Sequence, residues 1–100
     1  MYQAVAQGDV DVISAFSTEG RIAALDLVIL EDEQGAIPPY DALVLVSKRL
    51  QRQHPEAVAA LRALAGRIDE DRMRRMNLEV DAEGRSPSSV AHAFLDTLGQ

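Results

Sequence analysis

Two short runs of aliphatic residues, each unbroken by a polar residue, constrain the fold of this chain more than any other feature. They cover residues 27–30 and 43–46 and lack the alternation of apolar and polar side chains that a half-exposed strand shows. An unbroken apolar run of this length is typical of a strand that is covered on both faces in a parallel or mixed sheet. We therefore predict two buried β-strands here, and a third strand over residues 10–16.

A polar loop and two prolines separate the two runs. Pro38 and Pro39 each fix φ, and the residue before a proline avoids the helical region. The chain is therefore expected to cross in extended form here, and we divide it into residues 1–38 and 39–100.

Helical patterns dominate the second half of the chain. Ser47 is suited to cap a short helix that ends near His54, and Pro55 suits the first position of a second helix. This second helix is expected over residues 56–66, with an inward face made of Val58, Leu61, Leu64 and Ile68. Strands that come early and helices that come late predict an α/β fold.

Three further helical segments are expected nearer the ends. Residues 2–7 have the pattern of a helix end that Gly8 stops, which suggests a portion of a longer chain. Asp69 can cap a helix that faces inward through Met73, Met76 and Val80. Ser86 precedes a last helix that packs through Val90, Phe94, Leu95 and Leu98.

The charge balance argues against nucleic acid as a partner. Sixteen acidic against ten basic residues give a net charge of −6, which repels a phosphate backbone. No apolar run reaches the roughly 18 residues of a membrane span, and the first residues lack the pattern of an export signal. We expect this segment neither to enter a membrane nor to carry its own export signal.

Residues for catalysis or metal binding are scarce. The chain has no cysteine, and its two histidines, His54 and His92, lie far from any nucleophile motif. The acidic residues 31–33 lack the alternate spacing of a calcium loop. We therefore expect no enzymatic activity, no metal and no cofactor.

Three stretches in a fixed order carry the most specific signal. They are residues 8–22, which include Phe16-Ser17-Thr18-Glu19, residues 26–32, and Pro38-Pro39-Tyr40-Asp41. In this order they resemble the osmoprotectant-binding proteins of ABC importers, which include binders of glycine betaine, choline and proline.

The resemblance implies a fold and a role for the whole protein. The fold would be the two-lobed α/β type II periplasmic-binding-protein class, with a mixed sheet and helices concentrated in the C-terminal half. Residues 1–38 would finish the second lobe and form the hinge strand, and residues 39–100 would return to the first lobe. The parent protein would work outside the cytoplasm and deliver a small quaternary ammonium solute to ABC permease subunits.

The resemblance also implies a ligand site. Tyr40 and Phe16 fall on positions of the family's aromatic cage, although the family more often has tyrosine at the position of Phe16. A methylated cation cannot donate a hydrogen bond, so ring faces must bind it. Thr18 and Arg21 are expected to reach a ligand carboxylate, and Glu19 to accept hydrogen bonds within the loop. This chain would carry at most half of the pocket.

Plainer interpretations compete with these roles. An aromatic ring such as Phe16 usually packs in a core, a loop tyrosine such as Tyr40 is usually half-buried, and a loop arginine such as Arg21 usually forms a solvated ion pair. Tyr2 and Phe94 are expected to pack. The arginine cluster Arg72, Arg74 and Arg75 is expected on the solvated face of its helix.

A second class of function remains open. A fragment of a binding-protein fold leaves sheet edges and apolar faces uncovered, and another copy often closes such surfaces. The chain would then be an interaction or regulatory module that forms a homo-oligomer or a domain-swapped dimer without binding solute.

Overall fold

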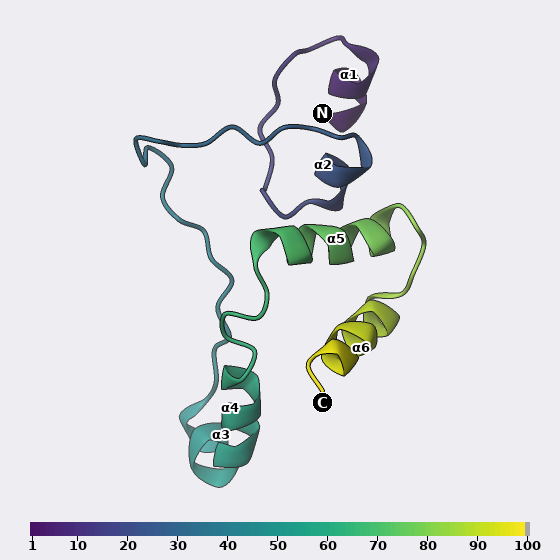
Figure 1. Cartoon of the computed structure of the whole chain (residues 1–100). Helices are drawn as coiled ribbons and strands as arrows, with labels where there is room; N and C mark the ends of the chain where they lie inside the picture. The colour runs from purple at the N-terminus through teal and green to yellow at the C-terminus, as the bar shows by residue number, and fades with distance from the viewer. Residues whose placement is uncertain (100) are drawn as a thin grey trace. The chain divides into compact units, whose positions relative to one another are not determined.

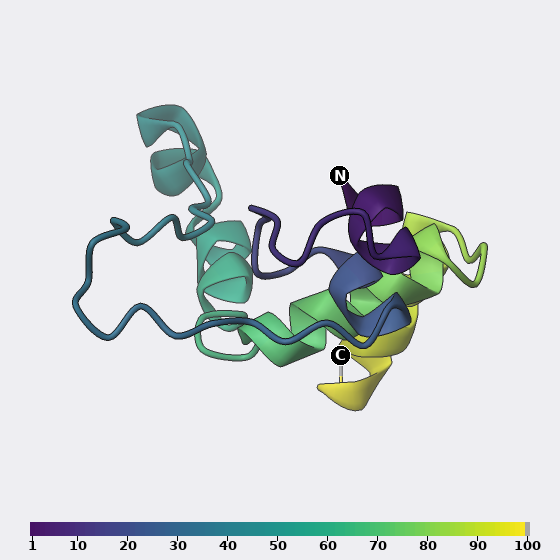
Figure 2. The same ribbon diagram turned by 90° about the horizontal axis from the view of Figure 1, so that it is seen from above.

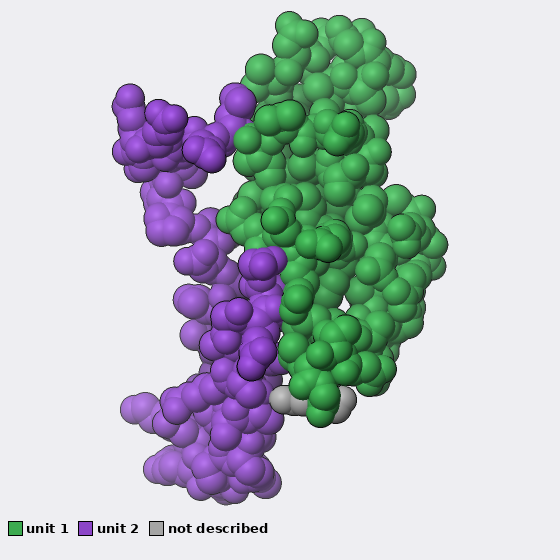
Figure 3. Space-filling model, viewed as in Figure 1, with its two compact units in different colours: residues 1–29, 70–100 green, residues 30–69 purple. Residues whose placement is uncertain are grey.

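The computed structural model describes residues 1–99 as six helices joined by turns and extended segments (Figures 1 and 2). The helices are α1 (Tyr2–Gln7), α2 (Gly20–Ala24), α3 (Lys48–Gln53), α4 (Pro55–Arg62), α5 (Glu70–Asp81) and α6 (Pro87–Thr97). They belong to two compact units, one made of Met1–Ile29 with Glu70–Gln100 and the other of Leu30–Asp69 (Figure 3). Among the described residues, no helix has the length and apolarity needed to cross a membrane.

The first unit is built on the contact between α2 and α5. The backbone of Gly20 lies so close to α5 that a Cβ atom there would stand 2.5 Å from the Leu78 amide nitrogen. Only glycine permits this approach, because any side chain would collide with the backbone of the facing helix. Ile22 of α2, Tyr2 of α1 and Val90 of α6 are the buried apolar residues of this unit. Helix α2 is not predicted by the sequence pattern, which places Gly20 and Arg21 in a polar loop.

Predicted helix ends are confirmed where capping residues define them. Gly8 follows α1 with a φ of 78°, in the left-handed region that glycine favours. The Ser47 hydroxyl accepts a hydrogen bond from the Leu50 amide at 3.1 Å, and the Ser86 hydroxyl accepts one from the Ser89 amide at 3.1 Å. Each hydroxyl satisfies an amide that has no partner inside its helix.

The second unit contains α3 and α4. Val58 is buried as predicted, but α4 ends at Arg62, earlier than the expected residue 66. A series of turns follows and includes Gly66 with a φ of 72°. Leu61 is 38% exposed, so its predicted inward position is wrong within this unit.

The predicted strands are not present among residues 1–99, which contain no β-ladder. Residues 10–16, 27–30 and 43–46 are irregular or extended, and Val28 and Leu45 are 86% and 90% exposed. A strand requires a neighbouring strand for its backbone groups and a covering layer for its side chains. The described residues provide neither for these runs, so the prediction that they are buried is wrong for this chain taken alone, and the mixed sheet is not observed.

Residues 32–37 form an ordered turn that precedes the two prolines. The Asp32 carboxylate accepts hydrogen bonds from the Ile37 amide at 2.7 Å and the Ala36 amide at 3.0 Å. These two backbone donors lower the pKa of Asp32 below its usual value. The turn therefore fixes the direction in which the chain enters Pro38, Pro39 and Tyr40.

Candidate functional site

The segment from Phe16 to Glu19 is a tight turn closed by two hydrogen bonds. The Phe16 amide donates to the Glu19 carboxylate at 3.2 Å, and the Glu19 amide donates to the Phe16 carbonyl at 3.1 Å. Glu19 is also the residue that precedes the first turn of α2. The predicted role of Glu19 as an acceptor within the loop is therefore observed.

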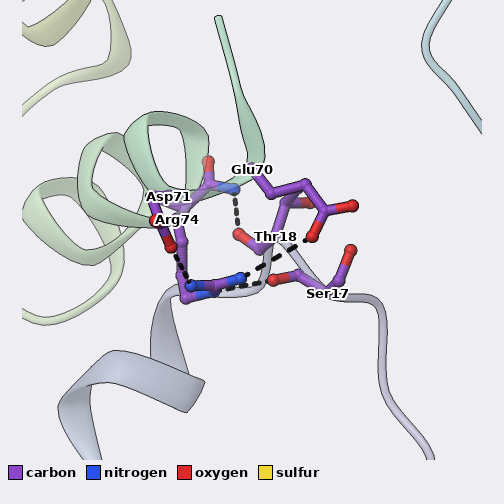
Figure 4. Close-up of polar contacts among 6 residues, drawn as sticks. Ser17, Thr18, Glu70, Asp71 and Arg74 are labelled. Atoms are coloured by element: carbon purple, nitrogen blue, oxygen red, sulfur yellow. Dashed lines mark hydrogen bonds and ion pairs between the residues drawn. The ribbon is translucent and has the colours of Figure 1, made fainter. Parts of the chain in front are cut away.

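Two side chains of α5 donate hydrogen bonds to backbone carbonyls of the same turn (Figure 4). Arg74 donates from Nε to the Ser17 carbonyl at 2.7 Å, and Asn77 donates from Nδ2 to the Thr18 carbonyl at 2.7 Å. Arg74 also binds the Asp71 carboxylate at 2.7 Å, and its side chain is only 16% exposed. The prediction that Arg74 lies on the solvated face of its helix is therefore wrong.

The sequence carries one signal for this contact. Arg74 and Asn77 are three residues apart and so lie on one face of α5. The approach of α2 to α5 brings the preceding turn within reach of this polar pair. Arg72 and Arg75 are exposed, as predicted, and the Arg72 guanidinium lies 5.6 Å from the centre of the Phe94 ring.

Tyr2 packs against this turn, as expected of a packing residue. Its ring is buried, and the Arg21 guanidinium lies 5.6 Å from the ring centre. Burial and the neighbouring Glu19 carboxylate raise the pKa of Tyr2 to about 12. The buried phenol oxygen has no hydrogen-bond partner of ordinary distance and angle. The Tyr2 phenol and the Phe16 amide in turn lower the pKa of Glu19.

These shifts predict how pH affects the first unit. The raised pKa of Tyr2 gives a stabilisation that is complete below the ordinary value of 10.0 and is lost as pH rises toward about 12. The lowered pKa of Glu19 gives a second stabilisation, which is present above the ordinary pKa of 4.5 and is lost as pH falls below it.

The measurement is an ultraviolet titration in a Tyr40→Phe background, where Tyr2 is the remaining tyrosine. We expect its midpoint near 12, and a lower midpoint after Glu19→Gln, because burial remains while the carboxylate is removed. A midpoint at the ordinary tyrosine value would show that Tyr2 is not buried.

The two candidate cage rings are exposed in their own units. Phe16 is 64% exposed in the first unit, and Tyr40 is 87% exposed in the second. Neither ring is part of a core among the described residues. Thr18 and Arg21 belong to the first unit with Phe16, where Thr18 is partly buried and Arg21 is exposed.

A separate groove of about 300 Å³ runs between α5 and α6 in the first unit. Arg85 and Glu79, two residues of its lining, form an ion pair. Its lining consists of Arg72, Arg75, Met76, Glu79, Arg85, Val90, Ala93, Phe94 and Thr97. Among the described residues, no group of His, Cys, Asp or Glu is arranged to hold a metal ion.

Comparison with known proteins confirms the resemblance seen in the sequence. Residues 1–97 match the family described as the substrate binding domain of ABC-type glycine betaine transport systems. A solved structure described as a glycine betaine/carnitine/choline ABC transporter is 41% identical and superposes with a TM-score of 0.89. That match covers 96% of this chain and 35% of the solved chain.

Curated relatives point the same way. Carnitine transport binding protein OpuCC of Listeria monocytogenes is 36% identical over 95% of this chain and 31% of its own length. Ergothioneine transport permease/ergothioneine binding protein EgtU of Helicobacter pylori is 32% identical over 98% of this chain and 18% of its own length. The chain thus spans about a third or less of the length of these relatives. Since the family match extends over residues 1–97, the chain belongs to the substrate-binding domain family of ABC-type glycine betaine transport systems.

Proposed function

We propose that this chain forms part of the solute-binding component of an ABC importer and carries part of a pocket for a quaternary ammonium solute. Its family consists of transport proteins that bind substrate rather than of enzymes. Such proteins work outside the cytoplasm and hand small solutes to permease subunits. Glycine betaine, carnitine and choline are the candidate solutes, because these are the solutes named for the solved neighbour.

The exposure of Phe16 and Tyr40 carries this proposal. Large aromatic rings are normally buried, and an exposed ring face can bind a methylated cation that forms no hydrogen bonds. Phe16 lies next to the clamped residues Ser17 and Thr18, and Tyr40 follows the turn ordered by Asp32. Phe16 is thus attached to a turn that α5 holds, and Tyr40 follows the Asp32 turn by three residues, while the two side chains are 64% and 87% exposed.

Domain assignments follow from the same proposal. Residues 1–38 would contribute to one lobe and the hinge, and residues 39–100 to the other lobe. The observed units divide the chain differently, because Glu70–Gln100 group with Met1–Ile29. The apolar runs at 27–30 and 43–46 would each form a strand within its own lobe of the complete binding domain, where a sheet can cover them.

Tyr40→Ala tests this function in a complete binding protein that contains residues 1–97. A suitable protein is a graft in which these residues replace the matching segment of the solved neighbour. Loss of one desolvated cation–π contact of about 2 kcal/mol should weaken glycine betaine binding about 30-fold, as measured by titration calorimetry.

Tyr40→Phe is the matched control, since it keeps the ring face and removes only the hydroxyl. Its affinity should stay within about threefold of the unchanged protein, because the ring face is the binding element. Unchanged affinity in Tyr40→Ala, with the protein still folded, would remove Tyr40 from the cage.

A further inference from the structure

Thr18 lies between two peptide planes that α5 holds in place. The Ser17 carbonyl belongs to the peptide that enters Thr18 and accepts a hydrogen bond from Arg74 at 2.7 Å. The Thr18 carbonyl belongs to the peptide that leaves it and accepts one from Asn77 at 2.7 Å. Because each peptide group is planar and rigid, fixing both planes fixes φ and ψ of the residue between them.

The two donors are themselves immobilised. The Arg74 side chain is only 16% exposed. Its guanidinium binds the Asp71 carboxylate at 2.7 Å and lies 3.9 Å from the Glu70 carboxylate. These acidic partners orient the guanidinium so that Nε points at the Ser17 carbonyl. The backbone contact of Gly20 with Leu78 keeps α5 at a fixed distance from the turn.

This arrangement determines the direction in which the Thr18 amide N–H points. In a trans peptide the C=O and the following N–H point in opposite directions, and the chain has no cis peptide among its described bonds. The Ser17 carbonyl points at α5, so the Thr18 amide N–H points away from it. An amide held in this way is a preorganised donor for a carboxylate.

We propose that Arg74 and Asn77 are positioning residues that aim the Thr18 amide at the carboxylate of a bound solute, and thereby favour carboxylated quaternary amines over choline. The inference deepens the proposed function and rests on it. Neither residue touches the solute; each acts through a backbone carbonyl of the turn.

The experiment compares glycine betaine, which carries a carboxylate, with choline, which does not. Asn77→Asp removes the donor and places a negative charge against the Thr18 carbonyl, and Arg74→Lys keeps the positive charge but loses the planar fork that serves Ser17 and Asp71 together. Both are made in the complete protein defined above. Arg75→Ala is the control, because it removes a neighbouring arginine of α5 that lines the groove between α5 and α6.

We expect Asn77→Asp and Arg74→Lys to weaken glycine betaine binding about tenfold or more, since a charge-assisted or buried contact is lost, and to change choline binding less than about threefold. Arg75→Ala should change neither. Equal losses for both solutes, or no loss for either, would overturn the positioning role while leaving the proposed function intact. If the unchanged protein binds neither solute, the proposed function fails and the inference fails with it.

Discussion

The 100-residue chain, produced alone, is expected to self-associate at micromolar concentration rather than to remain a folded monomer. The chain exposes large apolar side chains, among them Leu30 at 77%, Leu43 at 79% and Leu45 at 90%. Its buried apolar residues are few: Tyr2, Ile22, Val58 and Val90 among those described. Exposed apolar side chains of this kind are often covered by another copy, so association is expected to bury them.

Light scattering and sedimentation velocity measure this directly. The double substitution Leu43→Ser and Leu45→Ser should reduce association strongly, because these side chains are 79% and 90% exposed within one apolar run. Arg52→Ser is a matched control on the neighbouring helix α3, outside the run. A well-folded monomer of the unchanged chain at this concentration would contradict the prediction.

Helix positions followed from local sequence because their causes are local. The hydroxyls of Ser47 and Ser86 cap α3 and α6, and Gly8 ends α1. Each of these features depends on residues within one turn of the helix end. Helix α2 lacked such a signal: it spans five residues, begins at a glycine and has no side-chain cap. Its place is set by contact with α5, which is distant in the sequence.

Local sequence could not establish the sheet in the same way, because a strand forms only when another strand pairs with its backbone. The runs at 27–30 and 43–46 have the composition of buried strands, but no other described segment pairs with them. The chain covers 35% of the solved neighbour. The composition of each run favours a strand, but the pairing that a strand needs is not a property of the run itself.

The ligand roles of Phe16, Thr18 and Tyr40 remain predictions, because they rest on short motifs whose order carries information in the sequence itself. The contact between the turn and α5 could not be predicted in this way. Arg74 acts on Ser17 across 57 positions of sequence, and its cluster of basic neighbours resembled a solvated helix face. Distinguishing Arg74 from its neighbours required the packing of α2 on α5, which only the three-dimensional structure provides.

The isolated chain is expected to bind glycine betaine or choline too weakly for ordinary titration. A desolvated cation–π contact contributes about 2 kcal/mol, and an exposed one roughly 0.5–1 kcal/mol. Phe16 and Tyr40 are 64% and 87% exposed, so together they supply less than the upper limit of about 4 kcal/mol. Binding with a Kd of 1 mM requires about 4 kcal/mol after the cost of association has been met.

Titration calorimetry on the isolated chain and on the complete protein, under the same conditions, tests this difference. The complete protein should bind at micromolar Kd or below, since it adds the remaining contacts and excludes water from the rings, whereas the chain should give no measurable heat. Binding by the chain with a Kd below about 1 mM would contradict the partial pocket. Repeating that titration over a range of chain concentrations would then show whether a second copy supplies the missing contacts, because such binding would strengthen as the chain associates.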